Sequence, residues 1–310
     1  MNVSRWKFLI AFLVASLVLP VQSWASTYAK TKYPILLVHG LFGFDNIGGV
    51  EYFYDIPEAL RADGATVFVD TVSAANSTQV RGEQLLLQVQ QILAATGAEK
   101  INLIGHSHGG PTIRYVAAVA PNLVASVTSV DGVNKGSAVA DVLLGVAPPG
   151  SISNSILVTV SNALASLIDL LNGTPQLPEN ALAAAQSLST AGSLAFNKLY
   201  PQGVPTSACG NGDAQVNGVY YFSWTGSAQS TNILDVSDPI MDLTSLAFAG
   251  APNDGLVSTC SAHLGTVISD SYPQNHLDAV NQLLGLVDIF ATSPVTLYEN
   301  QANRLKGLGL

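Results

Sequence analysis

A serine between two glycines, in the stretch Gly105-His106-Ser107-His108-Gly109, is the strongest chemical signal in this chain. The short apolar run 101–104 before it predicts a buried strand, and the segment after it predicts a helix. A serine on such a turn exposes its hydroxyl to a base and a substrate, and the glycines permit the tight backbone. The pentapeptide alone is weak, and an ordinary serine in a glycine-rich turn is the alternative. The flanking elements favour Ser107 as a nucleophile.

A serine becomes a good nucleophile only when a base removes its proton, and the chain has five histidines. His39, His106 and His108 belong to strand-end motifs on the side of the nucleophile. Where a nucleophile occupies a strand-to-helix turn of this type, the acid and then the base follow it in the chain, which leaves His263 and His276. His276 lies in a polar loop before a predicted helix, whereas His263 closely follows a cysteine and is more typical of a structural residue. We therefore expect His276 to be the base.

The acid that orients this base must lie between Ser107 and His276. Asp254 is favoured because residues 253–257, Asn-Asp-Gly-Leu-Val, form a polar turn beside an apolar stretch, and an orienting carboxylate needs a rigid turn. An ordinary Asn-Asp-Gly β-turn is the alternative. The other carboxylates in this interval include Asp131, Asp141, Asp169, Asp213, Asp235, Asp238, Asp242, Asp270 and Glu179.

Two backbone N–H groups are candidates for binding an oxyanion. The N–H of His108 lies at the predicted helix N-terminus, where the helix dipole favours negative charge. The second donor should come from the loop after an early strand, and Leu41 occupies such a glycine-rich turn after the apolar run 35–38. Both groups act through the main chain, so the side chains at these positions matter little.

The elements that position these residues follow an alternating pattern. Apolar runs at 35–38, 66–69, 101–104 and 127–130 predict strands, and helical patterns lie between them. Strands that alternate with helices predict an α/β fold with a mostly parallel sheet and helices on both faces. A further strand is expected at 219–224. Because no internal repeat or disordered linker interrupts the pattern, we expect one domain over residues 26–310.

Residues 150–200 break the alternation and are rich in Ala, Ser and Leu, with very few charges. Apolar residues between Ile156 and Leu171 recur at helical spacing and form a wide stripe. A core-packed helix is one interpretation. The other is a lid at about 150–173, whose apolar face covers a substrate cleft and turns outward at a lipid surface. Proline and glycine at 148–150 and 172–175 would be its hinges.

The composition restricts the environment of the protein. Charged residues make up 11% of the chain and the formal net charge is −9, which argues against nucleic-acid partners and anionic membranes. Residues 1–25 have a short basic start, an apolar stretch and small residues before a cleavage point, which predicts a signal peptide. An uncleaved anchor is the alternative. Cleavage removes Arg5 and Lys7, and changes the formal charge from −9 to −11.

Two cysteines, Cys209 and Cys260, lie in the predicted mature chain. An exported protein meets an oxidising compartment, so these residues are expected to form one disulfide. Two buried free thiols are the alternative. Metal binding by two distant cysteines without a Cys-x-x-Cys pair is disfavoured.

Together these motifs resemble the secreted bacterial triacylglycerol lipases of the Pseudomonas lipase family, over essentially all of residues 26–310. The resemblance implies an α/β-hydrolase fold, a triad of Ser107, Asp254 and His276, and a helical lid. It also implies hydrolysis of long-chain acylglycerol esters at a lipid–water interface. The segments that carry it are 32–35, 39–46, 80–85, 105–111, 253–257 and 275–278.

The resemblance further implies one calcium ion near the histidine loop, bound by Asp235, Asp278 and the carbonyls of Gln282 and Leu286. Hard oxygen ligands with two negative charges suit Ca²⁺, and Asp238 is expected to support the site without being a ligand. A membrane-anchored foldase that assists maturation in the periplasm, followed by export through the outer membrane, is also implied. The chain departs from the family at Leu41, where relatives carry Met, and at 133–134, where many carry Pro-His.

Three other functions have to be compared with these motifs. A carboxylesterase that acts on soluble short-chain esters would use the same triad, and the apolar helix between 156 and 171 favours a lipase without deciding between the two. A non-catalytic lipid-binding protein on a degenerate hydrolase fold would lack a triad member, and none is missing here. Transfer of the acyl group to acceptors other than water is also compatible with this chemistry.

Overall fold

A computed structural model gives the structure of the protein. It describes residues 26–41, 43, 46–47, 50–146, 153, 155–156, 158–160, 162–163 and 179–310. The predicted signal peptide at 1–25 and most of the predicted lid at 150–173 lie outside the described residues. Among the described residues, no helix has the length and apolar character needed to cross a membrane.

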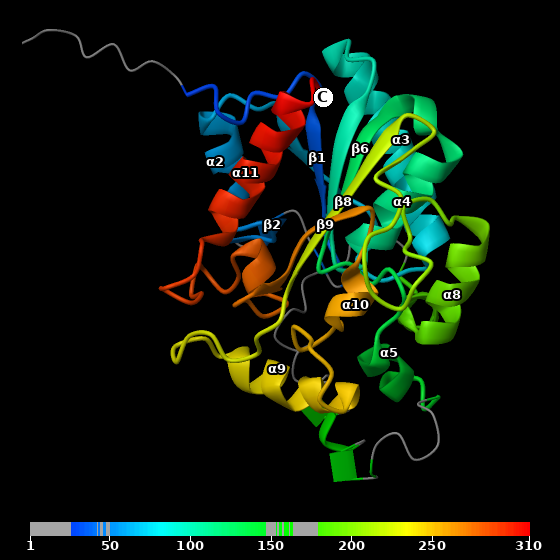
Figure 1. Cartoon of the computed structure of the whole chain (residues 1–310), viewed down its shortest axis with the longest axis vertical. Helices are drawn as coiled ribbons and strands as arrows, with labels where there is room; N and C mark the ends of the chain where they lie inside the picture. The colour runs from blue at the N-terminus through cyan, green and yellow to red at the C-terminus, as the bar shows by residue number, and fades with distance from the viewer. Residues whose placement is uncertain are drawn as a thin grey trace, which may run out of the picture.

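A seven-stranded sheet forms the centre of the molecule, in the order β4-β1-β5-β6-β8-β7, with β9 also paired to β8 (Figure 1). All pairs are parallel except β7 with β8. This arrangement confirms the predicted α/β fold with a mostly parallel sheet. The strands are β1 (Ile35–Val38), β4 (Val67–Val69), β5 (Ile101–His106), β6 (Val124–Val130), β7 (Gln215–Val216), β8 (Val219–Gly226) and β9 (Thr266–Tyr272).

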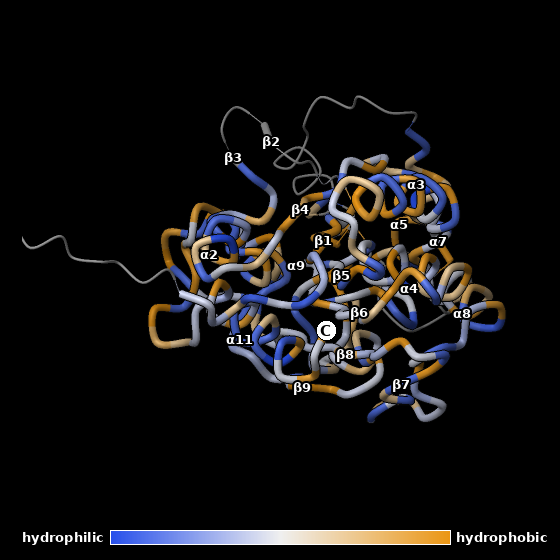
Figure 2. The backbone as a smooth tube through the Cα atoms, turned by 90° about the horizontal axis from the view of Figure 1, so that it is seen from above, coloured by the Kyte–Doolittle hydropathy of each residue, from blue (hydrophilic) through white to orange (hydrophobic). Residues whose placement is uncertain are grey.

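Helices cover both faces of this sheet because the central strands bury side chains on each face. In β1, Ile35 and Leu37 pack toward helices α2 (Ile56–Ala62) and α11 (Pro294–Gly307). Leu36 and Val38 point the other way, toward α3 (Thr78–Thr96) and α4 (Gly109–Val119). The view from above shows the strands running between these two helical layers (Figure 2).

The remaining elements extend from the carboxyl ends of the strands or lie at the edges. A small antiparallel pair, β2 with β3, follows the loop after β1. The bounds of all these remaining elements are β2 (Asn46–Ile47), β3 (Val50–Glu51), η1 (Pro121–Leu123), α5 (Ala138–Leu143), α7 (Ala181–Leu188), α8 (Thr190–Leu199), α9 (Asp238–Ser245), η2 (Leu246–Phe248), α10 (Thr259–Ala262) and η3 (Asp278–Val280).

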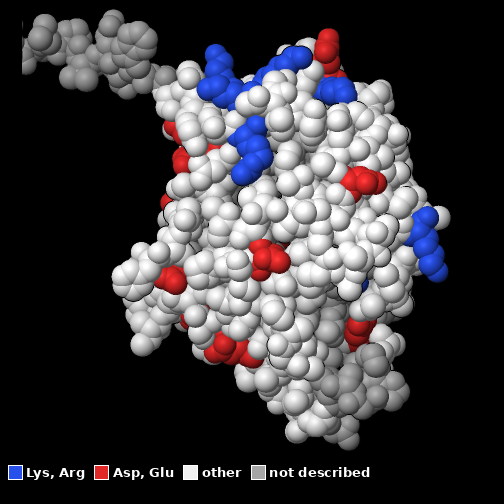
Figure 3. Space-filling model, in the orientation of Figure 1, with Lys and Arg blue, Asp and Glu red and all other residues white. Residues whose placement is uncertain are grey.

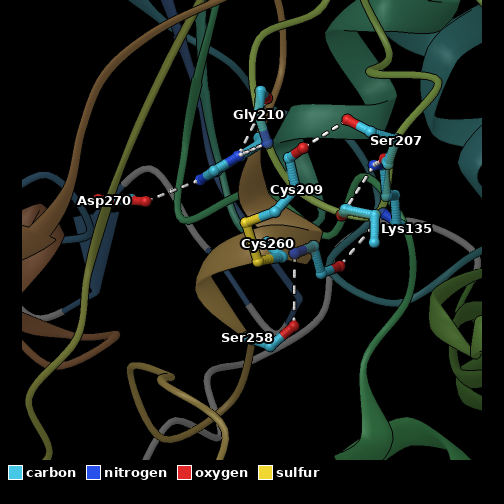
Figure 4. The surroundings of a disulfide bond; sticks show 10 residues. Lys135, Ser207, Cys209, Gly210, Ser258, Cys260 and Asp270 are labelled. Atoms are coloured by element: carbon cyan, nitrogen blue, oxygen red, sulfur yellow. Dashed lines mark hydrogen bonds and ion pairs between the residues drawn. A yellow bond between two sulfur atoms is a disulfide. The ribbon is translucent and has the colours of Figure 1, made fainter.

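Cys209 and Cys260 form a disulfide, as the sequence predicts, with an S–S distance of 1.98 Å. Figure 4 shows the bond between the loop that precedes β7 and the short helix α10. The backbone N–H of Gly210 donates to Nδ1 of His263 at 3.0 Å, and Nε2 of His263 lies 3.3 Å from Asp270. The disulfide and these contacts restrain α10 and His263, which follow Asp254 in the chain.

Candidate active site

Ser107 lies between β5 and α4 with a backbone φ of 56°, in the left-handed region that non-glycine residues rarely adopt. Its N–H donates to the carbonyl of Val130 at 3.0 Å, which joins the turn to the end of β6. A Cβ atom on Gly105 would collide with the carbonyl of Gly109, and one on Gly109 would collide with that of Val38. The glycines therefore allow the helix to approach the sheet closely, and the serine side chain remains 8% exposed.

His276 and Asp254 form a buried pair, with Nδ1 of the histidine 2.7 Å from Oδ2 of the aspartate. The other carboxylate oxygen, Oδ1, accepts the N–H groups of Leu256 and Val257 at 2.9 and 2.7 Å. The backbone N–H of His276 also donates to the carbonyl of Asp254 at 2.9 Å. With Nδ1–H directed at the carboxylate, Nε2 of His276 is left to accept a proton. The carboxylate thereby fixes both the tautomer and the orientation of the imidazole.

Two opposing effects determine the pKa of His276. Burial lowers it, because the charged imidazolium is poorly solvated, but the charge and hydrogen bond of Asp254 outweigh burial. The pKa of His276 is therefore raised above its ordinary value. The imidazole can accept a proton from a neighbouring hydroxyl more readily than a buried histidine without a carboxylate partner.

Buried polar groups hold the loop that contains Leu41. The N–H of His39 donates to Oδ1 of Asp70 at 2.9 Å, and the guanidinium of Arg81 donates to the carbonyl of His39 at 2.6 Å. The backbone of Gly40 lies against Ser107, since a Cβ atom placed on Gly40 would be 3.2 Å from Oγ of Ser107. This loop therefore brings the residues beside Leu41 next to the serine hydroxyl.

His108 is fully buried, and its imidazole contacts α3. Its Nε2 lies 3.0 Å from the hydroxyl of Thr78. Burial and then the positive charge of Arg81 hold the pKa of His108 well below its ordinary value, so the ring is neutral. His108 is also the N-cap of α4. Its backbone N–H therefore lies at the positive end of the helix dipole, beside Ser107.

A chain of hydrogen bonds links the loop after β1, the nucleophile strand and the histidine loop. The N–H of Gly40 donates to the hydroxyl of Tyr52 at 3.1 Å, and that hydroxyl lies 2.7 Å from Nδ1 of His106. Nε2 of His106 donates to the carbonyl of His276 at 2.9 Å, since a carbonyl can only accept. Neutral His106 must then accept the Tyr52 proton at Nδ1. Sequence reasoning missed Tyr52, which carries no motif of its own.

Asp235 and Asp278 are both buried, and each has one carboxylate oxygen, Oδ2 and Oδ1 respectively, without a hydrogen-bond partner. Burial, and then repulsion from Asp235 and Asp238, raise the pKa of Asp278 to about 7. Asp238 differs, because its Oδ2 accepts the N–H groups of Thr231 and Asn232 at 2.7 and 2.8 Å. Two carboxylate oxygens without hydrogen-bond partners, near a third carboxylate, are the kind of ligand atoms that a hard cation prefers.

Another group that could hold a metal ion comprises His106, Asp131 and His276, whose potential ligand atoms lie within 4.8 Å of one another. However, both ring nitrogens of His106 are already hydrogen-bonded. Binding there would also occupy the histidine that pairs with Asp254. A cation at this cluster would therefore compete with hydrogen bonds that the two histidines already make.

The described part of the predicted lid packs near the histidine loop. The described residues between 155 and 163 are helical, and Val160 is fully buried. Val160 and Ile156 contact an apolar cluster that includes Met241 of α9 and Leu277, the neighbour of His276. Val158 is 59% exposed, so this helical segment has one buried and one exposed side.

The fold and these contacts define the class of the protein. Residues 33–278 match the family model described as alpha/beta hydrolase fold. A Bacillus licheniformis lipase shares the fold with a TM-score of 0.57 at 19% identity, over 81% of this chain and 87% of that one. A metagenomic carboxyl esterase does so with a TM-score of 0.58 at 20% identity, over 94% of this chain and 80% of the other.

Close sequence relatives narrow the class. A triacylglycerol lipase of Vibrio cholerae is 57% identical, over 97% of this chain and 99% of its own length. A triacylglycerol lipase of Pseudomonas fragi is 46% identical, over 91% and 98% respectively. The chain belongs to the alpha/beta hydrolase family and, within it, to the bacterial triacylglycerol lipases of the Pseudomonas type.

The hydrogen-bond chain through Tyr52 gives a direct prediction. Tyr52→Phe leaves the N–H of Gly40 and Nδ1 of His106 buried without partners, at about 1–3 kcal/mol for each group. Because the loop then loses its fixed distance from Ser107, we expect kcat on a soluble ester to fall roughly tenfold, with KM nearly unchanged. Steady-state kinetics measure both constants.

Tyr28→Phe is the matched control, because the Tyr28 hydroxyl donates to Asn300 at 2.7 Å on the protein surface. It should leave both constants unchanged. A Tyr52→Phe variant that raises KM at constant kcat would show that Tyr52 serves substrate binding and not the geometry of the catalytic loop.

Proposed function

We propose that this chain is a secreted lipase that hydrolyses long-chain acylglycerol esters at a lipid–water interface through the triad of Ser107, His276 and Asp254. The buried hydrogen bond between His276 and Asp254, beside a serine on a left-handed turn, is the observation that carries this proposal. Ring centroids of His276 and His106, the residue before the serine, are 4.6 Å apart. The base and the nucleophile thus belong to one compact cluster.

The reaction follows from these positions. Oγ of Ser107 attacks the acyl carbonyl while Nε2 of His276 accepts the hydroxyl proton, and Asp254 stabilises the imidazolium. The backbone N–H groups of Leu41 and His108 bind the oxyanion, each contributing roughly 3 kcal/mol to the transition state. The proton on His276 then passes to the leaving alkoxide, which departs as the alcohol. Water, deprotonated by His276, finally attacks the acyl-enzyme. The bond between the acyl carbon and Oγ of Ser107 then breaks, His276 returns the proton to Oγ, and the fatty acid leaves.

The surface near the site is compatible with an apolar substrate phase. On the face shown in Figure 3, most of the Lys and Arg gather near the end of the molecule opposite α9, with another on the flank near α8. Only a few acidic residues lie around α9. Few charges would therefore lose hydration when this end meets lipid. A lid over residues 150–173 would cover the cleft in water and open at the interface.

We also propose a signal peptide at 1–25, a single catalytic domain over 26–310, and maturation with a foldase in the periplasm before export. The disulfide supports passage through an oxidising compartment. The foldase and the export route rest on the family resemblance alone. Refolding of the purified mature chain without other proteins, with calcium and an oxidant, tests the need for a foldase.

We assign the cation expected near the histidine loop to Ca²⁺, held by Asp235, Asp278 and the carbonyls of Gln282 and Leu286. The buried carboxylate oxygens of Asp235 and Asp278 that have no hydrogen-bond partner support this assignment. Bound calcium would supply two positive charges that offset the mutual repulsion of the aspartates. Asp278 lies two residues after His276, so the same ion would restrain the loop that carries the base.

Ser107→Ala removes the nucleophile and should lower the hydrolysis rate of emulsified long-chain triglyceride by at least about 10⁴-fold. The melting temperature should not fall, because alanine fits the same space. Titration of released fatty acid measures the rate. Ser271→Ala, an exposed change on β9, should retain full activity. Long-chain hydrolysis that persists in Ser107→Ala would refute the assignment of the nucleophile.

The same assay on wild-type protein distinguishes a lipase from a carboxylesterase. A lid-gated lipase should show a sharp rise in rate once the ester concentration exceeds its solubility and an emulsion forms. A rate that saturates smoothly below that limit would indicate an esterase for soluble substrates.

Removal of calcium with a chelator should lower the melting temperature, and added calcium should restore it. At a free calcium concentration about 100 times Kd, the expected shift is roughly 5 °C or more. Differential scanning calorimetry measures it without reference to activity. The calcium-dependent shift should be lost in Asp235→Asn and kept in Asp242→Asn, whose carboxylate instead accepts the hydroxyl of Ser230. Equal shifts in both variants would refute the site.

A further inference from the structure

Asp131 is a fully buried carboxyl at the end of β6, next to the catalytic cluster. Its backbone N–H donates to the carbonyl of Trp224 at 3.0 Å, and Oδ1 accepts the N–H of Gly226 at 2.8 Å. Its φ of 46° places it, like Ser107, in the left-handed region. Contacts to β8 therefore fix both the backbone and one oxygen of this residue.

The second oxygen, Oδ2, is buried and has no hydrogen-bond partner, because the hydroxyl of the neighbouring Thr225 donates instead to the carbonyl of Gly226 at 3.1 Å. One oxygen of this carboxyl lies within 4.8 Å of nitrogens of both His106 and His276. An unpartnered buried carboxyl oxygen carries a desolvation cost, so its position beside the catalytic histidine requires an explanation. The reaction proposed above does not use it.

The protonation state of Asp131 explains how a second carboxyl group is tolerated beside His276 and Asp254. Burial, and then the negative charge of Asp254, raise the pKa of Asp131 to about 8, so the group is mostly protonated at neutral pH. The site thus avoids two carboxylate charges beside one imidazole. The titratable groups that face Asp131 are His106, His276, Asp254, Tyr52 and Tyr298.

We propose that Asp131 is a positioning residue of the catalytic centre. Its reserve role is to stabilise the imidazolium form of His276 when Asp254 has lost its charge. This inference rests on the proposed triad of Ser107, His276 and Asp254. Asp131 comes from the strand next to the one that ends at Ser107, whereas Asp254 comes from the loop before α10. The two carboxyls therefore reach the histidine from independent parts of the fold.

The proposal has a specific consequence when Asp254 loses its charge. In Asp254→Asn, the repulsion that helps to keep Asp131 protonated disappears, and Asp131 releases its proton to solvent more readily. The resulting carboxylate lies within 4.8 Å of a nitrogen of His276 and stabilises the imidazolium that forms during the reaction. Asp131 should therefore matter more in the Asp254→Asn protein than in the wild type.

A double-mutant cycle with Asp131→Asn and Asp254→Asn tests this. Asparagine keeps the oxygen that accepts the N–H of Gly226 while removing the charge. We expect Asp131→Asn to lower kcat on a soluble ester by at most about threefold in the wild type, but by about tenfold or more in the Asp254→Asn background, with KM within about twofold throughout. Melting temperatures show that each variant is folded.

Asp141→Asn is the matched control, because Asp141 is a buried carboxyl that binds the N–H and hydroxyl of Thr190 instead. It should lower kcat equally in both backgrounds, as a purely structural change would. Equal factors for Asp131→Asn in the two backgrounds would overturn the reserve role and leave the triad intact. If Asp254→Asn retained full activity, and the further change Asp131→Asn did not lower that activity, the proposed triad would instead be refuted.

Discussion

The left-handed backbone at Ser107 is the constraint on which the rest of this site depends. A non-glycine residue with a φ of 56° is strained, and it persists only because the surrounding structure holds it. Gly105 and Gly109 let α4 start almost in contact with β1 and β5, and the end of β6 accepts the serine N–H. The turn at the carboxyl end of β5 therefore places the serine hydroxyl next to the loop that contains Gly40.

Once Ser107 is fixed, the other groups of the site are held relative to it and to one another. Asp254 binds His276 through both side chain and backbone, and the bridge of Tyr52 and His106 ties the histidine carbonyl to Gly40. No described contact in this network depends on a flexible surface side chain. The low solvent exposure of these residues strengthens their hydrogen bonds and keeps water from competing for them.

The sequence predicts β1 with its observed bounds and predicts that a helix, α4, follows Ser107, because both segments have distinct patterns and clear flanks. It misses β9, whose Thr, Ser and Asp residues form a half-exposed edge strand without an apolar run. Motif chemistry identified the pair of His276 and Asp254, which the fold brings together. Tyr52 and Asp131 could not be selected in this way, since only the sheet topology brings them to the site from distant chain positions.

Active-site labelling with a fluorophosphonate tests the central claim most directly, because this reagent reacts only with a serine that a neighbouring base has activated. The account predicts one label per chain, located on Ser107 by peptide mass spectrometry, with ester hydrolysis lost in proportion to labelling. Labelling should be slowed strongly by His276→Ala. A label on another residue, or full activity in a chain labelled at Ser107, would contradict the account.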